Sequence, residues 1–219
     1  MKLFLALPVY DGYDPHFINS LLHLQAEQPC SMIIRPMIGD SLVSRARNSL
    51  AADFLASDAT HLLFLDTDLI FTPEHIKRLL SHDEPIVAGL YPKKQPELAW
   101  VCNVLPGEAP DARGLQRVKY IGTGCLLIRR DVLERMIAVH PECAYVTDAG
   151  QVQRTEHDLF PVGPMFDPEQ NATRYHSEDW GFCRRALDLG YEIWADTRVA
   201  LKHVGQCVYP LVDPFAQAA

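Results

Sequence analysis

Short apolar runs alternate with helical patterns of apolar residues along the first ninety positions of the chain. The first run, Leu3–Val9, ends at a turn-rich segment that contains Gly12 and Pro15. Runs of this length bounded by turn residues predict buried strands, here at 3–9, 31–38, 61–65 and 84–90. Because strands that alternate with helices form βαβ units, the pattern predicts an α/β fold with a mostly parallel sheet.

Apolar residues recur at helical spacing between these strands. A first helix is expected over 14–26, starting at Asp14-Pro15, with an inward stripe formed by Phe17, Ile18, Leu21, Leu22 and Leu24. A second is expected from Asp40 or Ser41 to about Ser57, with an apolar stripe formed by Leu42, Val43, Leu50, Phe54 and Leu55. Thr72-Pro73-Glu74 has the residue types of a helix start and predicts a short third helix.

The remainder of the chain is less periodic. Four prolines in 92–116 predict a loop, and two strands are expected at 117–121 and 125–129, joined through Gly122-Thr123-Gly124. Further helices are expected over 131–140 and 177–189, and a last strand over 191–195. The stretch 141–176 has several prolines and little periodicity, which predicts a long loop of the kind that usually carries function.

The composition is that of an ordinary globular protein. Hydrophobic residues make up 48% and charged residues 22% of the 219 residues, enough for one domain with its own core. The net charge of −8 disfavours a broad nucleic-acid-binding surface. The six cysteines form no CxxC pair, so we expect reduced thiols and a cytoplasmic protein. No apolar stretch approaches the roughly 20 residues of a transmembrane helix.

Two aspartates lie one residue apart directly after a buried apolar run, in Leu62-Leu63-Phe64-Leu65-Asp66-Thr67-Asp68. They follow the carboxyl end of a strand, the edge at which open α/β sheets bind ligands. Neighbouring carboxylates repel each other unless a cation lies between them, and Mg²⁺ or Mn²⁺ prefers one or two carboxylates plus phosphate oxygens. The triplet therefore indicates a metal–diphosphate site. The alternative is a solvated turn, in which aspartate is common.

An acidic pair opens the helix expected at 177–189. Ser177-Glu178-Asp179 is good helix-start chemistry in its own right. Gly181 in the first turn is unfavourable for a helix unless another group must approach closely. A carboxylate here could act as a general base toward an attacking hydroxyl group.

Two further groups are candidates for ligand contacts. His203 could join a metal already held by carboxylates, although a lone histidine is more often structural. Arg47 could pair with phosphate and Asn48 with a base edge. The alternative for Arg47 and Asn48 is an exposed polar face of the second helix.

In their order along the chain these motifs resemble those of GT-A glycosyltransferases, in particular small members related to family 2. The resemblance covers roughly residues 3–205 and rests on the set Pro8-Val9-Tyr10, Ala46-Arg47-Asn48, Asp66-Thr67-Asp68, Gly122-Thr123-Gly124-Cys125, Glu178-Asp179-Trp180-Gly181-Phe182 and His203. It implies one GT-A domain over 1–219, with a Rossmann-like, mostly parallel sheet flanked by helices and a smaller mixed sheet on the acceptor side. Residues 1–90 would bind the nucleotide-sugar, and 91–219 would bind the acceptor and catalyse transfer.

The resemblance also implies a role for each motif residue. The nucleotide-sugar would be bound by Pro8, Val9, Tyr10, Asp11, Arg47, Asn48, Asp66, Thr67 and Lys93. The acceptor site would contain Gly122, Thr123, Gly124 and Trp180. Mn²⁺ or Mg²⁺ would be held by Asp66, Asp68 and His203. Asp179, or Glu178 as the weaker candidate, would be the base of an inverting transfer.

The resemblance implies a UDP-sugar donor but does not identify the acceptor. A saccharide, a lipid-linked intermediate, a protein side chain and a modified base in nucleic acid all stay open. Five basic residues in the second half keep an anionic acceptor among them, namely Arg113, Arg117, Lys119, Arg129 and Arg130.

Three other functions are alternatives to a glycosyltransferase. A haloacid dehalogenase-like phosphatase also uses Asp-x-Asp after an apolar strand, but on its first strand rather than the third. A sugar-nucleotidyltransferase would need a basic, glycine-rich loop after the first strand, whereas Tyr10–Asp14 is acidic. A non-catalytic sugar-nucleotide-binding module would keep the same pocket without turnover.

Overall fold

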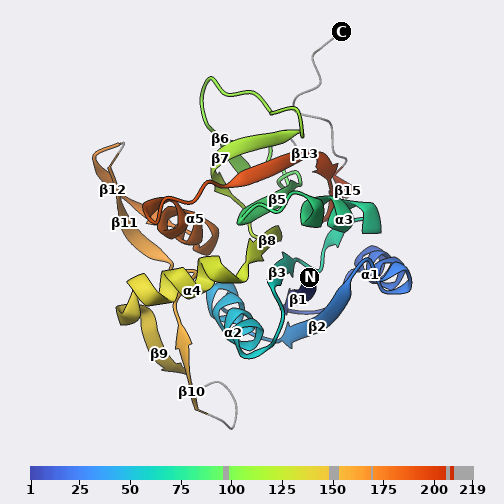
Figure 1. Ribbon diagram of the computed structural model, residues 1–219, viewed down its shortest axis with the longest axis horizontal. Helices are drawn as coiled ribbons and strands as arrows, with labels where there is room; N and C mark the ends of the chain where they lie inside the picture. Colours follow the sequence, from blue (N-terminus) through green and yellow to red (C-terminus); the bar gives the residue numbers. More distant parts are fainter. Residues whose placement is uncertain (96–98, 148–152, 169, 206–207, 210–219) are drawn as a thin grey trace.

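The computed structural model describes residues 1–95, 99–147, 153–168, 170–205 and 208–209 (Figure 1). Within them, eight strands form a central sheet in the order β2-β1-β3-β8-β5-β13-β7-β6. In that order the strands are Ser31–Ile38, Lys2–Val9, His61–Leu65, Cys125–Arg129, Ile86–Leu90, Trp194–Ala200, Leu115–Ile121 and Cys102–Val104.

Most strands of this sheet point the same way. β1 pairs in parallel with β2 and β3, and β5 pairs in parallel with β13. β8 is antiparallel to both β3 and β5, and β7 is antiparallel to β13 and β6. The prediction of a mostly parallel sheet is therefore confirmed, with β8 inserted in the opposite direction between two strands of the first ninety residues.

Helices cover both faces of the sheet. α1 (Pro15–Glu27) and α3 (Pro73–Ser81) pack on one face, and α2 (Val43–Ala56), α4 (Arg130–Val139) and α5 (Glu178–Asp188) on the other (Figure 1). Alternate residues of a strand point to opposite faces, so Leu3 and Leu5 of β1 join the α1 side while Phe4 and Ala6 join the α2 side. The fold therefore has three layers, with a hydrophobic core on each face of the sheet.

The apolar stripes predicted for the first two helices are only partly correct. Leu22, Leu42 and Val43 are exposed, although each was expected to face inward. On α2 the polar residues Arg47, Asn48 and Ser49 are buried instead, so the alternative of an exposed polar face is wrong. The reason is that Asp66 and Glu178 flank Arg47, while β10 (Arg154–His157) and the segment 158–160 cover Ser49 and Asn48.

The stretch predicted as one long loop contains two hairpins in its described part. β9 (Ala144–Thr147) pairs with β10 (Arg154–His157), and β11 (Gly163–Asp167) pairs with β12 (Ala172–His176), after a 3₁₀ turn at Pro141–Cys143. The loop prediction is wrong because these strands are largely exposed and lack the apolar alternation of a half-buried strand.

Smaller differences lie near the ends of predicted elements. The last sheet strand is Trp194–Ala200 rather than 191–195, and β6 lies inside the predicted loop 92–116. β4 (Leu69–Ile70), β14 (Lys202–Val204) and β15 (Val208–Tyr209) form a separate three-stranded sheet. That sheet brings the segment after β13 against the aspartate triplet.

The cysteines of the described residues are free thiols. Cys125, Cys143 and Cys183 are buried, Cys30 and Cys102 are half-buried, and Cys207 lies outside the described residues. Burial raises the pKa of the Cys183 thiol to about 12. None of the helices in the described residues combines the length and apolar character needed to cross a bilayer.

Candidate functional site

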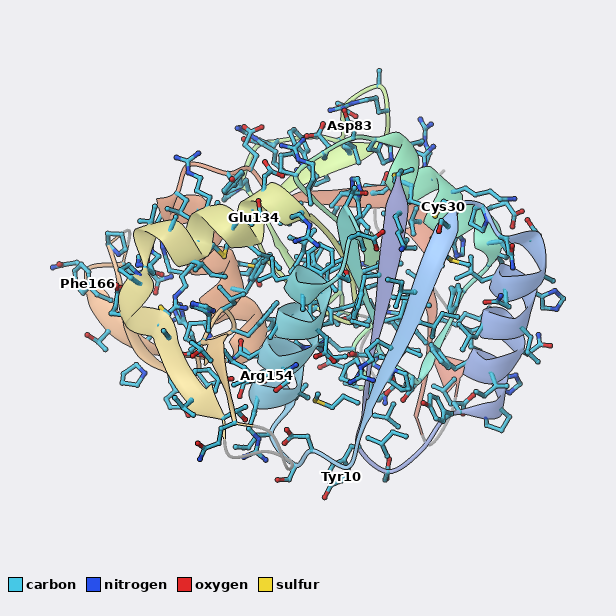
Figure 2. The ribbon with its side chains drawn as sticks, turned by 60° about the horizontal axis from the view of Figure 1, so that its bottom comes forward. Tyr10, Cys30, Asp83, Glu134, Arg154 and Phe166 are labelled. Atoms are coloured by element: carbon cyan, nitrogen blue, oxygen red, sulfur yellow. The ribbon has the colours of Figure 1, made fainter. Side chains whose placement is uncertain are left out.

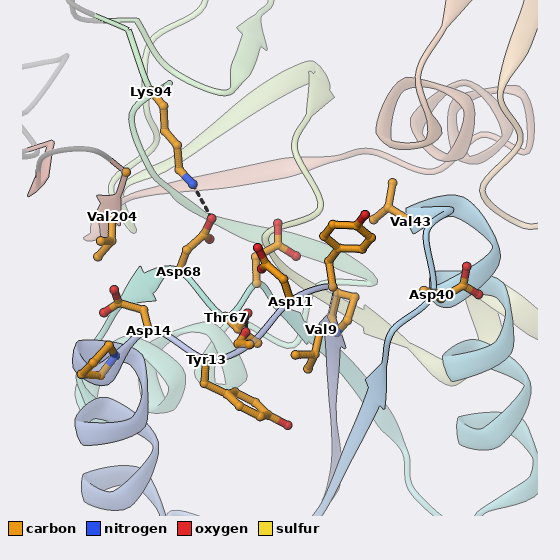
Figure 3. Close-up of a pocket in the computed structure, with 17 residues that line it drawn as sticks. Val9, Asp11, Tyr13, Asp14, Asp40, Val43, Thr67, Asp68, Lys94 and Val204 are labelled. Atoms are coloured by element: carbon orange, nitrogen blue, oxygen red, sulfur yellow. Dashed lines mark hydrogen bonds and ion pairs between the residues drawn. The ribbon is translucent and has the colours of Figure 1, made fainter.

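A pocket of about 650 Å³ opens where β1 and β3 end (Figure 3). Its walls are formed by the turn after β1, residues 8–15, and by the triplet after β3, residues 66–68. The start of α2, Lys94 and Val204-Gly205 complete the lining. The carboxyl ends of parallel strands thus meet at one edge, as the sequence predicts for a ligand site.

The triplet is fixed to both neighbouring segments by hydrogen bonds. The Asp14 N–H donates to the Thr67 carbonyl at 3.1 Å, and the Thr67 hydroxyl donates to the Gly12 carbonyl at 3.1 Å. On the other side, the Val204 N–H donates to the Asp68 carbonyl at 2.8 Å. The turn after β1, the triplet and β14 therefore form one connected rim around the pocket.

Asp68 is the most closely surrounded carboxylate of the pocket. Its Oδ2 lies 2.5 Å from Lys94 Nζ and 3.4 Å from His203 Nε2. Its Oδ1 is buried without a hydrogen-bond partner among the described residues. Burial raises the pKa of Asp68, but the interactions with His203 and Lys94 outweigh it and hold the pKa below its ordinary value. Asp68 is thus an ionised carboxylate whose Oδ2 is shared by Lys94 and His203.

His203 is oriented toward Asp68 by the chain segment that follows β5. Its Nδ1 lies 2.8 Å from the Pro92 carbonyl, which can only accept, so Nδ1 donates. Its Nε2 lies on the Asp68 side, and the Tyr91 ring packs edge-on against the imidazole. A hydrogen bond from the other ring nitrogen to a backbone carbonyl is typical of metal-binding histidines. Asp68 and His203 therefore fit a divalent cation.

Asp66, expected as a third metal ligand, binds a different partner. Its Oδ1 accepts from Arg47 Nη2 at 2.9 Å, and no group of three His, Cys, Asp or Glu side chains within the described ranges is close enough to hold a metal. Two protein ligands agree with a cation that completes its shell with phosphate oxygens and water.

Arg47 links the triplet to the acidic pair of α5. The guanidinium is buried, 2.9 Å from Asp66 and 3.6 Å from Glu178 Oε1. The two carboxylates outweigh the effect of burial and raise the pKa of Arg47. Burial raises the pKa of Glu178, while Arg47 counteracts the rise. Arg47 is therefore held between two acids in this structure rather than in the pocket wall.

Asn48 is likewise engaged inside the protein. Its Oδ1 accepts from the Leu159 and Phe160 N–H groups at 2.9 and 3.0 Å, and its Nδ2 donates to Asp158 at 3.0 Å. Arg154, beside α2 in Figure 2, donates to Glu156 and to the Ser49 carbonyl. These bonds fasten the β9–β10 hairpin and the following segment to α2.

The glycines of the motifs allow close packing of protein groups. A Cβ at Gly124 would lie 2.6 Å from the Tyr91 hydroxyl and 2.9 Å from Asp66 Oδ2. A Cβ at Gly122 would lie 2.4 Å from the same hydroxyl, and Thr123 between them is buried. A Cβ at Gly181 would lie 2.0 Å from the Pro161 carbonyl oxygen. The close approach inferred from the sequence at Gly181 is thus made by backbone.

The first turn of α5 presents Asp179 and Trp180. Asp179 Oδ1 accepts from the Trp180 N–H at 2.8 Å and from the Ser177 hydroxyl. Trp180 is half-buried and stacks on Tyr120 at 4.2 Å. Neither residue lines the 650 Å³ pocket, and Arg47, which contacts both Glu178 and Asp66, connects the start of α5 to the triplet.

The basic residues of the second half have acidic or carbonyl partners. Arg113 pairs with Glu84, Arg117 with Glu108 and Glu192, and Arg129 with Asp131. Arg130 donates to backbone carbonyls at the end of α2, including those of Phe54 and Ser57. These basic residues are dispersed in local pairs and do not form one basic surface that would favour an anionic acceptor.

Some of the residues predicted to bind the nucleotide-sugar line the pocket, and other lining residues were not predicted. Pro8, Val9, Tyr10 and Asp11 line the pocket, and Tyr10 projects into solvent at its edge (Figure 2). Lys93 is exposed outside the lining, and the neighbouring Lys94 lines it instead. Tyr13, Asp14 and Asp40 were not expected there. A loop lysine has no periodic signal, so only the three-dimensional position separates Lys94 from Lys93.

No protein-family model matches the sequence, and no curated protein matches it. Solved structures do match. The crystal structure of A197 from STIV matches at a TM-score of 0.56 and 16% identity, over 100% of this chain and 97% of that one. The structure of GalNAc-T7 with UDP, GalNAc and Mn²⁺ matches at a TM-score of 0.59 and 9% identity, over 100% of this chain.

The chain has a GT-A-like fold. It spans 45% of the GalNAc-T7 chain, which is a GT-A glycosyltransferase. At these identities the likeness concerns the fold. In a GT-A-like frame the pocket at the ends of β1 and β3, next to the triplet, is the candidate functional site.

Proposed function

We propose that this chain is a metal-dependent glycosyltransferase of the hexosyltransferase type, using a nucleotide-sugar with UDP as the nucleotide. The observation that carries the proposal is the ionised Asp68 in the pocket lining, with His203 Nε2 3.4 Å from its Oδ2. The GT-A-like fold and the GalNAc-T7 structure with UDP, GalNAc and Mn²⁺ support it.

Asp68 and His203 would hold Mn²⁺ or Mg²⁺, and the turn after β1 would receive the nucleoside. When bound, the ion would neutralise charge on the departing diphosphate as a Lewis acid. Lys94 lies near enough to Asp68 to reach phosphate oxygens at the same place. These residues would position the donor with its diphosphate at the ends of the parallel strands.

Asp179 would take the proton of the acceptor hydroxyl in a single displacement with inversion. It lies in the half-buried first turn of α5, next to Trp180, whose ring could contact an acceptor. Glu178 is more buried and paired with Arg47, which suits a positioning role. The anomeric configuration of the product, measured by NMR, tests this assignment, since retention is incompatible with Asp179 as a simple base.

The first experiment is a thermal-shift panel with UDP-, GDP-, ADP- and CMP-linked sugars, each with Mn²⁺ or EDTA. A ligand that binds the native state raises its melting temperature by mass action. We expect UDP-sugars with Mn²⁺ to stabilise the wild type, and Asp68→Asn to abolish the effect while keeping the side-chain shape. Asp58→Asn is the matched control, because this exposed aspartate precedes β3 at the opposite edge of the sheet.

The outcome separates the competing functions. Lack of metal-dependent stabilisation by every nucleotide would contradict the proposal, and p-nitrophenyl phosphate hydrolysis would then point to a phosphatase. Stabilisation without hydrolysis or transfer of the sugar would favour a non-catalytic nucleotide-sugar-binding module.

A further inference from the structure

The pocket has an excess of negative charge. Five aspartates line it, namely Asp11, Asp14, Asp40, Asp66 and Asp68. Among the described residues, Lys94 is the one lysine or arginine in the lining. A pocket with this balance attracts cations and repels a free diphosphate.

Lys94 contacts the atom that a metal would need. Its Nζ lies 2.5 Å from Asp68 Oδ2, the oxygen that is also 3.4 Å from His203 Nε2 (Figure 3). A divalent ion bridging Asp68 and His203 would stand next to the ammonium group, and like charges at such distances repel strongly. The ion and the lysine therefore exclude each other at Oδ2.

Hydrogen bonds hold the backbone of the two residues before Lys94. The Pro92 carbonyl accepts from His203, and the Lys93 N–H donates to the Ala99 carbonyl at 2.7 Å. The four-carbon stem of lysine turns easily and its ammonium group pairs readily with phosphate. Displaced from Asp68, Lys94 can move to a diphosphate while its backbone stays in place.

We propose that Lys94 is an exchangeable cation that occupies the Asp68 carboxylate in the empty pocket and transfers to the donor diphosphate when a metal ion binds. This inference rests on the proposed function. It makes metal and nucleotide bind cooperatively, because the nucleotide removes the lysine that opposes the metal. By thermodynamic linkage the metal strengthens nucleotide binding by the same factor.

Mn²⁺ binding, measured by electron paramagnetic resonance of the free ion, tests the inference without any turnover. In the absence of nucleotide, Lys94→Ala should bind Mn²⁺ about two- to fivefold more tightly than wild type, as a partly exposed ion pair allows. Lys93→Ala, the exposed neighbour outside the pocket, should equal wild type. Lys94→Arg keeps the charge and should also resemble wild type.

The same titrations with UDP present complete the test. UDP should strengthen Mn²⁺ binding by a larger factor in wild type than in Lys94→Ala. Equal Mn²⁺ affinity of wild type and Lys94→Ala without UDP would overturn the inference and leave the proposed function standing. Absence of Mn²⁺ binding by all variants, with and without UDP, would overturn both.

Discussion

At the residue scale, the motif positions that look catalytic in the sequence divide into two groups. Asp68 lines the pocket, and its Oδ2 lies 3.4 Å from His203 Nε2. Arg47, Asn48 and Gly181 instead contact other parts of the protein. The motifs contain both groups because a functional site needs buried residues that hold its ligand-binding residues in place.

Gly181→Ala separates these two kinds of role. Helix propensity alone predicts that alanine stabilises a helix by about 1 kcal/mol relative to glycine. The added Cβ would lie 2.0 Å from the Pro161 carbonyl oxygen, a backbone atom that cannot rotate away. We therefore expect a loss of about 1–3 kcal/mol in the free energy of unfolding. Urea unfolding measures the sign, and a stabilised variant would show that the close contact does not form.

At the scale of elements, α2 is held by a hairpin that follows it by about a hundred residues. Ser49, Tyr145 and Arg154 all donate to the buried Glu156 carboxylate. Burial and the nearby Glu156 raise the pKa of Tyr145. The polar side chains of α2 are thereby buried with their hydrogen bonds made. A prediction based on apolar periodicity therefore misses the burial of this side of the helix.

Asn48→Ala tests this attachment. The change would leave the buried Leu159 and Phe160 N–H groups without their acceptor. We expect the free energy of unfolding to fall by about 2–3 kcal/mol. Hydrogen exchange of those two amides should accelerate, and urea unfolding should report the loss. If Asn48 instead acted on the nucleotide, stability would be unchanged and nucleotide affinity would fall.

The first turn of α3 should make stability sensitive to pH. The Thr72 N–H donates to His75 Nδ1 at 3.3 Å, which requires a neutral ring, and burial lowers the pKa of His75 from its ordinary 6.5. The unfolded chain therefore binds the proton more readily than the folded one. The stabilising contribution is complete above pH 6.5 and is lost as the pH falls toward the folded value.

His75→Gln is the matching variant, because glutamine keeps an acceptor for the Thr72 N–H and does not titrate. The stability difference between wild type and His75→Gln should stay constant above neutral pH and shift against wild type below about pH 6.5. The titration of the other histidines contributes equally to both proteins and cancels in the difference between their free energies of unfolding. If urea unfolding showed the same difference in stability between wild type and His75→Gln at every pH, the pH dependence would not come from His75.

At the scale of the whole molecule, the sequence predicts the order of elements well and their pairing poorly. The strands of the first ninety residues lie where the apolar runs predict, because buried strands carry continuous apolar residues. β11 and β12 escaped prediction because their side chains are mostly exposed. Asp68 and His203 were predicted to lie together, and the pairing of β14 with β4 brings them close, whereas the contact of Lys94 with Asp68 was not predicted.

The position of β8 has a consequence for how the protein is made. β3 and β5 do not pair with each other in the described structure, since each pairs with β8, which begins at Cys125. A ribosome that has released the first ninety residues has therefore delivered two central strands without their common neighbour. Strand pairing over such sequence distances is slow, and unpaired edges invite association. Chaperone protection of the nascent chain matters most until residues 125–129 emerge.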